Sequence, residues 1–122
     1  MQRQKIGDIA FVAGRWPLDP ELETIVCIHG AGGTNLLWHE QVEALADRMN
    51  TIAPDLPGHG ESGGQAMDRI EDYARSMSEF IRSTGVKRPV ICGLSMGGAI
   101  ALQLMIDGRE DYRAGIAANT GA

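Results

Sequence analysis

A serine flanked by glycines is the residue in this sequence with the clearest capacity for chemistry. Gly93-Leu94-Ser95-Met96-Gly97 is a G-x-S-x-G pentapeptide that joins an apolar run to a helical pattern. At such a junction a sharp turn lifts the serine hydroxyl above a sheet, at a helix N-terminus whose free N–H groups favour a developing oxyanion. The flanking glycines Gly93 and Gly97 let neighbouring backbone approach. The pattern predicts a nucleophile elbow with Ser95 as the attacking group, and the alternative is an ordinary N-capping serine.

A glycine-rich hexapeptide supplies the second chemical signal. It runs His29-Gly30-Ala31-Gly32-Gly33-Thr34 and directly follows another apolar run. A turn of this kind can direct backbone N–H groups into a cleft beside the elbow. We predict an oxyanion hole formed by the N–H groups of Ala31 and Met96, with Gly30 in support. The alternatives are a plain strand-to-helix turn or a phosphate-binding loop, which lacks here the Lys-Ser/Thr pair of a P-loop.

A third glycine pattern, residues 58–63, matches the G-x-G-x-x-G fingerprint of dinucleotide-binding proteins. That fingerprint must open a helix directly, so that a pyrophosphate meets the helix N-terminus. Here the helical pattern starts only near Asp68, and Pro54 and Pro57 hold the approach extended. We interpret the match as spurious, which disfavours a nucleotide-binding oxidoreductase.

Short β-type runs alternate with helical patterns and must position these motifs. Residues 3–6 and 9–13 flank Gly7-Asp8 and predict a hairpin with a glycine-first turn. The later predicted strands are residues 24–28, 51–53, 90–92 and 114–118, and the predicted helices carry apolar positions over 38–49, 70–81 and 97–107. The last helix is apolar almost all round, which predicts burial on several sides. This alternation predicts an α/β fold with a mostly parallel sheet and helices on both faces.

Composition excludes several classes of protein. The 122 residues carry a formal net charge of −5 and are 43% hydrophobic, which suits a single domain with a core. The cations form no basic patch, so we expect neither a nucleic-acid nor a membrane partner. Cys27 and Cys92 lie in apolar runs and suggest neither a disulfide framework nor a zinc site. We see no signal peptide or membrane span, and expect a cytoplasmic protein without a metal or an organic cofactor.

Three motifs together resemble those of the α/β-hydrolase superfamily, especially its small serine esterases and cofactor-free haloperoxidase-like members. They are His29-Gly30, the Asp-Leu-Pro-Gly-His-Gly-Glu-Ser loop at residues 55–62, and the elbow at residues 93–98, in family order across essentially the whole chain. The resemblance implies that the elbow serine is the nucleophile and that His29 and His59 have supporting roles. A serine at the elbow also separates the chain from dehalogenases and epoxide hydrolases, which carry aspartate there.

The rest of the catalytic triad departs from the family pattern, in which an acid and a histidine follow the serine. His29, His39 and His59 all precede Ser95, and no histidine follows it. The later acids lie about 15–20 Å along the last helix, at 1.5 Å per residue; they are Asp107, Glu110 and Asp111. We interpret residues 1–122 as the N-terminal portion of an α/β-hydrolase domain, a truncated fold lacking the C-terminal strands, the lid and the catalytic histidine.

Two functional hypotheses follow from this interpretation. The first is a carboxylesterase-like serine hydrolase that acts on a small-molecule ester through an acyl-enzyme on Ser95, with the isolated chain inactive or weakly active. The second is a non-catalytic α/β module that assembles through an exposed sheet edge. In either case the last strand would be an unpaired apolar edge, so we expect it to bind the missing C-terminal half or a second copy of the chain. The substrate is not specified, because the lid and late loops shape the pocket in this family.

Overall fold

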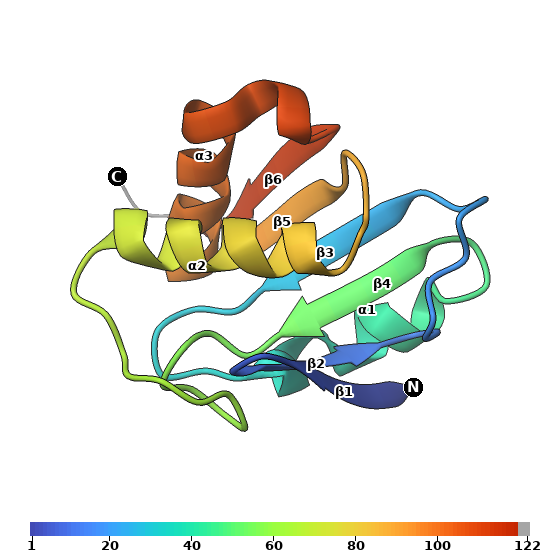
Figure 1. Cartoon of the computed structure of the whole chain (residues 1–122), viewed down its shortest axis with the longest axis horizontal. Helices are drawn as coiled ribbons and strands as arrows, with labels where there is room; N and C mark the ends of the chain where they lie inside the picture. Colours follow the sequence, from blue (N-terminus) through green and yellow to red (C-terminus); the bar gives the residue numbers. More distant parts are fainter. Residues whose placement is uncertain (120–122) are drawn as a thin grey trace.

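The computed structural model describes residues 1–119, and an antiparallel hairpin forms the first edge of its sheet (Figure 1). β1 (Gln2–Ile6) pairs with β2 (Ile9–Ala13), with Ile6 opposite Ile9. Gly7 opens the connecting turn with a φ of 56°. Positive φ at the first turn position matches the twist of paired strands, so the glycine-first hairpin is confirmed.

The remaining strands form the parallel part of a six-stranded sheet. They are β3 (Thr24–Ile28), β4 (Asn50–Pro54), β5 (Val90–Leu94) and β6 (Ala114–Ala118). The strand order is β1-β2-β4-β3-β5-β6, and every pairing from β4 to β6 is parallel. Apolar runs without polar alternation suit strands covered on both faces. The predicted α/β fold class with a mostly parallel sheet is confirmed.

The helices that connect the strands differ in how well their sequence patterns predicted them. They are η1 (Asn35–Trp38), α1 (His39–Ala44), α2 (Ile70–Ser83), α3 (Met96–Gly108) and η2 (Arg109–Asp111). The prediction of one helix reaching Met49 is wrong. A 3-10 turn capped by the Thr34 hydroxyl comes first, and the α-helix ends at Ala44. The N–H groups of Arg48 and Met49 then bond to the Leu45 carbonyl, which turns the chain toward β4.

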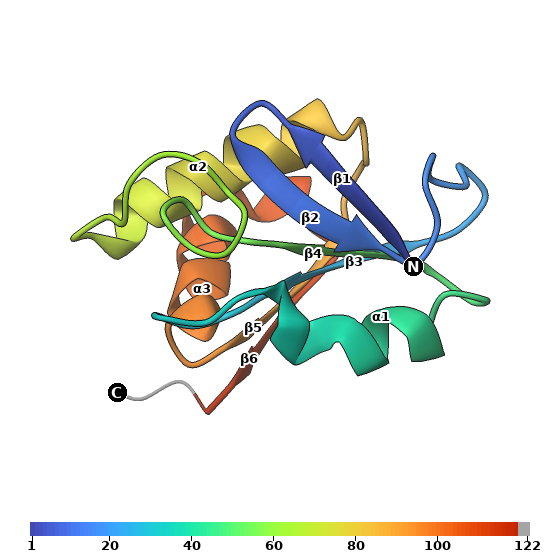
Figure 2. The ribbon, with the colours of Figure 1, turned by 90° about the horizontal axis from the view of Figure 1, so that it is seen from below.

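Helices cover the two faces of the sheet unequally, as Figure 2 shows. α2 and α3 lie together on one face, where most of the buried apolar side chains gather, and α1 lies on the other. The smaller core beneath α1 consists of Val12, Cys27, Val42 and Ala53. The prediction that α3 is buried on several sides is wrong, because Leu102 is 49% and Ile106 77% exposed. α3 packs mainly against α2, β5 and β6.

The edge formed by β6 carries the least cover. β6 pairs only with β5 within the described chain, which agrees with the predicted apolar edge. Ile116 lies opposite Cys92 on that pair and is 48% exposed. Over residues 1–119, none of the helices has the length and apolar character that crossing a membrane demands.

Candidate active site

The turn between β5 and α3 holds Ser95 in an unusual backbone conformation. Ser95 has φ 58° and ψ −119°, a region that residues with a Cβ rarely adopt, and its surface is exposed. Its N–H donates to the Ala118 carbonyl of β6 at 2.9 Å. Its carbonyl accepts from the N–H groups of Gly98 and Ala99 at 2.9 and 3.2 Å. The sheet on one side and the first turn of α3 on the other thus maintain the sharp corner.

Two glycines allow the elbow to pack this tightly. A Cβ on Gly97 would collide with the carbonyl oxygens of Ile28 and His29 at the end of β3. A Cβ on Gly93 would collide with the carbonyl of Gly97 itself. Glycine at both positions is therefore required by close backbone approach, which is the role that the pentapeptide pattern predicted for them.

The glycine-rich loop after β3 lies directly against the elbow. A Cβ built on Gly30 would be 3.4 Å from the Cβ of Ser95 and 3.6 Å from the backbone nitrogen of Met96. The Gly33 N–H donates to the Gly30 carbonyl at 3.1 Å and closes the loop, which leaves Ala31 exposed. The structure thus brings the predicted nucleophile beside the loop of Ala31 and beside Met96, the first residue of α3.

His29 is fully buried beneath this loop. Its Nε2 accepts the Leu56 N–H at 3.0 Å, and its Nδ1 lies 2.7 Å from the Gly30 carbonyl oxygen. Burial lowers the pKa of His29, since the charged ring would lose its hydration; the bond to the Gly30 carbonyl opposes this in part. A neutral imidazole at this position links the loop after β3 to the loop after β4.

Asp55 organises the loop after β4, a role that the sequence analysis missed. Its carboxylate is 2% exposed and accepts the N–H groups of Asn35 at 2.7 Å and Glu61 at 2.9 Å. The Ser62 hydroxyl donates to the Asp55 carbonyl at 2.6 Å and accepts the Ala10 N–H at 2.9 Å. The only sequence signal was a carboxylate at the end of a strand, because its partners lie elsewhere in the chain.

The remaining predicted features fall outside this site. The glycines at 58–63 form a turn closed by the Gly58 N–H and the Gly63 carbonyl, and α2 starts only at Ile70. His39 lies on α1, with its Nε2 2.7 Å from Asn35 Oδ1. The acids at the far end of α3 and in η2 are exposed; they are Asp107, Glu110 and Asp111. In the described part of the chain, no three His, Cys, Asp or Glu side chains gather as a metal site would require.

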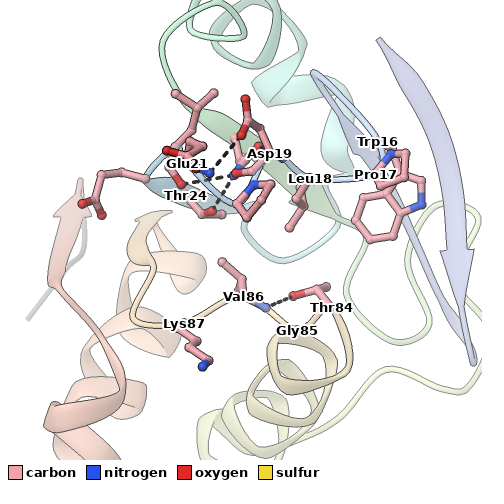
Figure 3. Close-up of a pocket in the computed structure, with 14 residues that line it drawn as sticks. Trp16, Pro17, Leu18, Asp19, Glu21, Thr24, Thr84, Gly85, Val86 and Lys87 are labelled. Atoms are coloured by element: carbon pink, nitrogen blue, oxygen red, sulfur yellow. Dashed lines mark hydrogen bonds between the residues drawn. The ribbon is translucent and has the colours of Figure 1, made fainter.

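A cavity of about 550 Å³ lies at the opposite, amino-terminal end of the parallel strands (Figure 3). Residues 16–24 form one wall, and residues 84–87, which follow α2, form the other. Asn50 lies at its base, 2% exposed, with its side chain bonded to Asp19, Leu22 and Thr24. None of the lining residues belongs to the loops around Ser95.

Comparison with known proteins identifies relatives of this arrangement. A family model described as "alpha/beta hydrolase fold" matches residues 23–120. The chain is 38% identical over 86 residues to the dihydrolipoyllysine-residue acetyltransferase component of the acetoin cleaving system of Cupriavidus necator, covering 70% of this chain and 23% of that protein. It is 34% identical over 86 residues to the pimeloyl-[acyl-carrier protein] methyl ester esterase of Nitrosomonas europaea, covering 70% and 32%.

A solved structure shows the same fold. A thermophilic esterase from Thermogutta terrifontis superposes with a TM-score of 0.84 at 28% identity, covering 100% of this chain and 47% of that one. The chain therefore spans less than half the length of these relatives.

Proposed function

Because the chain belongs to the α/β-hydrolase fold family, we propose that it carries the nucleophile and the oxyanion hole of a serine hydrolase that acts on carboxylic esters. One observation carries the proposal. An exposed serine at positive φ is held at the start of a helix, with the backbone of Gly30 packed against it. This arrangement suits attack on a carbonyl carbon beside two main-chain donors.

The chemistry we propose proceeds through an acyl-enzyme. The Ser95 hydroxyl loses its proton to a general base as Oγ bonds to the ester carbonyl carbon. The carbonyl oxygen becomes an oxyanion and accepts the N–H groups of Ala31 and Met96. The carbonyl re-forms as the alcohol leaves with the proton, and water then hydrolyses the ester on Ser95 by the same two steps.

We assign the general base and its acid to residues outside this chain. His29 and His59 each have both ring nitrogens at hydrogen-bond distance from backbone groups, and His39 contacts Asn35. A base must instead reach Ser95 Oγ. The chain also covers only 23% and 32% of two curated relatives. Residues 1–122 would thus be the N-terminal part of a hydrolase domain whose partner at the β6 edge is the C-terminal part.

The ester class of substrate is supported by the relatives. One is named as a methyl ester esterase and another as a thermophilic esterase. Both names describe enzymes that act on esters, and we propose Ser95 as the nucleophile for such chemistry in this chain. A role confined to assembly through the β6 edge is the alternative, and it predicts no reaction at Ser95.

Covalent labelling tests the proposal. A fluorophosphonate probe is incubated with the chain alone and with the chain supplied with a C-terminal hydrolase segment that provides a downstream Asp and His. We expect slow modification of the chain alone, a rise of at least about 100-fold with the segment, and none in Ser95→Ala. Ser83→Ala, at an exposed serine on α2, is the matched control and should label normally. Absence of a Ser95 adduct in the completed protein would overturn the proposal.

A further inference from the structure

Two histidines connect the loop after β3 and the loop after β4 in opposite directions. His29 belongs to the first loop, and its Nε2 accepts the Leu56 N–H of the second loop at 3.0 Å. His59 belongs to the second loop, and its Nε2 accepts the Gly32 N–H of the first loop at 3.1 Å. The two rings lie side by side, with centroids 5.2 Å apart. Each loop thus supplies an imidazole nitrogen that accepts a hydrogen bond from a backbone N–H of the other loop.

The hydrogen-bond partners determine the protonation state of both rings. A nitrogen that accepts an N–H carries no proton, so both Nε2 atoms are unprotonated. The ring proton must then sit on Nδ1, and each Nδ1 faces a carbonyl oxygen of its own loop. That oxygen belongs to Gly30 at 2.7 Å for His29 and to Pro57 at 3.0 Å for His59. Both imidazoles are therefore neutral Nδ1–H tautomers.

The surroundings of the His29 ring disfavour a positive charge. His29 is fully buried, which lowers its pKa, and the neighbouring His59 lowers it further. The ring of Tyr73 lies 6.2 Å from that of His59, and its hydroxyl accepts the Met67 N–H. Among residues 1–119, Asp55 is the carboxylate that raises the pKa of His29, and its two oxygens already accept N–H groups of Asn35 and Glu61. The neutral state of His29 thus fits its environment.

We propose that His29 and His59 are positioning residues, a reciprocal pair of neutral imidazoles that holds the glycine-rich loop after β3 against the elbow. Protonation of either ring releases this loop. A protonated Nε2 becomes a donor, and it would then face the backbone N–H that it had accepted. The catalytic consequence rests on the proposed function, because Gly32 is the direct neighbour of Ala31, the expected oxyanion donor. A shift of the loop that displaces the Ala31 N–H would weaken stabilisation of the transition state more than it weakens binding of the ester.

The first test is a pH titration of the chain followed by NMR of the ring nitrogens and backbone amides. We expect Nδ1–H tautomers for both histidines at neutral pH. On acidification the Gly32 amide should shift together with the His59 ring, and the Leu56 amide together with the His29 ring. His39 is the internal control, and its titration should leave both amides unchanged. An Nε2–H tautomer in either ring, or amides that ignore the titration, would overturn the proposal.

The second test separates positioning from simple structural support. His59→Gln retains a carbonyl oxygen that can accept the Gly32 N–H, whereas His59→Phe cannot. In the protein completed with its C-terminal segment, we expect the phenylalanine variant to lower kcat for an activated ester by about 10- to 100-fold, with KM nearly unchanged. The glutamine variant should stay within about threefold and lose part of the acid dependence of kcat. His39→Gln is the control and should match the wild type.

The two proposals fail in different ways. If the wild type neither labels nor turns over while the ring and amide titrations remain coupled, the proposed hydrolase function is wrong and the imidazole pair stands. If turnover is normal but His59→Phe matches His59→Gln in kcat, the positioning role is wrong.

Discussion

The two ends of the parallel strands use polar side chains for different purposes. At the amino-terminal end, Asn50 bonds through its amide to two carbonyls, a hydroxyl and one N–H, all within the segment from Asp19 to Thr24. At the carboxyl end, His29 and His59 bond across two separate loops, beside an exposed Ser95 at positive φ. The first network closes on itself, whereas the second one connects two loops beside a strained and exposed residue.

This difference supports separate roles for the two ends in our proposal: the amino-terminal end stabilises the fold, and the carboxyl end carries the chemistry. The cavity of about 550 Å³ lies at the amino-terminal end, away from the end at which we propose the chemistry. Strain at a non-glycine residue costs roughly 1–3 kcal/mol and persists only where the surroundings enforce it. Such strain at Ser95, rather than an open pocket, is the reason why we propose the carboxyl end as the functional one. The following predictions test that division.

Removal of the Ser95 side chain should produce the largest effect, a loss of activity without a loss of stability. In the completed protein, Ser95→Gly should lower turnover at least about 1,000-fold. It should also raise stability by up to about 1 kcal/mol, because glycine relieves the positive φ. Ser95→Ala is the control: it keeps a Cβ, so it should lose activity without that gain. Urea denaturation and ester turnover are the measurements, and a glycine variant less stable than the alanine variant would contradict the strain argument.

Gly97→Ala should destabilise the fold and the site together. The added Cβ meets two carbonyl oxygens of β3 and the loop after it, which cannot yield without shifting backbone. We expect a loss of about 2–4 kcal/mol in the free energy of unfolding, together with loss of Ser95 labelling. Gly7→Ala, at a positive φ with open space around it, should cost only about 1 kcal/mol. Equal costs at the two positions would show that close approach does not constrain the elbow.

Asn50→Ala should affect stability but leave the chemistry intact. Loss of this buried side chain leaves the carbonyls of Asp19 and Leu22 without their amide donor, at a cost of about 1–3 kcal/mol. Labelling of Ser95 per folded molecule should match the wild type. Gln103→Ala, which removes an exposed bond to Asp107, should change stability by less than about 0.5 kcal/mol. A labelling defect in folded Asn50→Ala would break the division between the two ends.

Acid should lower the free energy of unfolding because of His29, which lies at the carboxyl end of the parallel strands. Burial lowers the pKa of His29 in the folded chain, so below the ordinary imidazole value of about 6.5 the unfolded state binds more protons. Its contribution to stability is therefore present above that pH and is lost as the pH falls, with a slope of up to about 1.4 kcal/mol per pH unit. Urea denaturation between pH 5 and 8 measures it. The slope should flatten in His29→Gln and persist in His39→Gln, and an unchanged slope in His29→Gln would refute the assignment.

The sequence predictions were accurate where they depended on neighbouring residues and failed where they depended on residues far apart in the chain. The strands at residues 24–28 and 114–118 have the predicted bounds, because an apolar run is a local property. The first helix was overextended to Met49, since apolar spacing continued past the turn at Leu45. Burial of α3 was overestimated for Leu102 and Ile106, because an apolar helix face does not reveal whether a neighbour covers it. The roles of Asp55 and Asn50 were missed, since each bonds to residues 20 or more positions away.

The amino-acid sequence by itself determined the alternation of strands and helices, the glycines that a tight corner needs, and the serine placed in it. These are local properties, set by side-chain size, backbone freedom and periodicity over a few residues. Only the tertiary structure decided that Gly30 packs against Ser95 and that the amino-terminal end closes around Asn50. It also decided that His29 and His59 each accept an N–H from the loop of the other. Hydrogen bonds of this kind depend on distance and direction in space, which no spacing along the chain specifies.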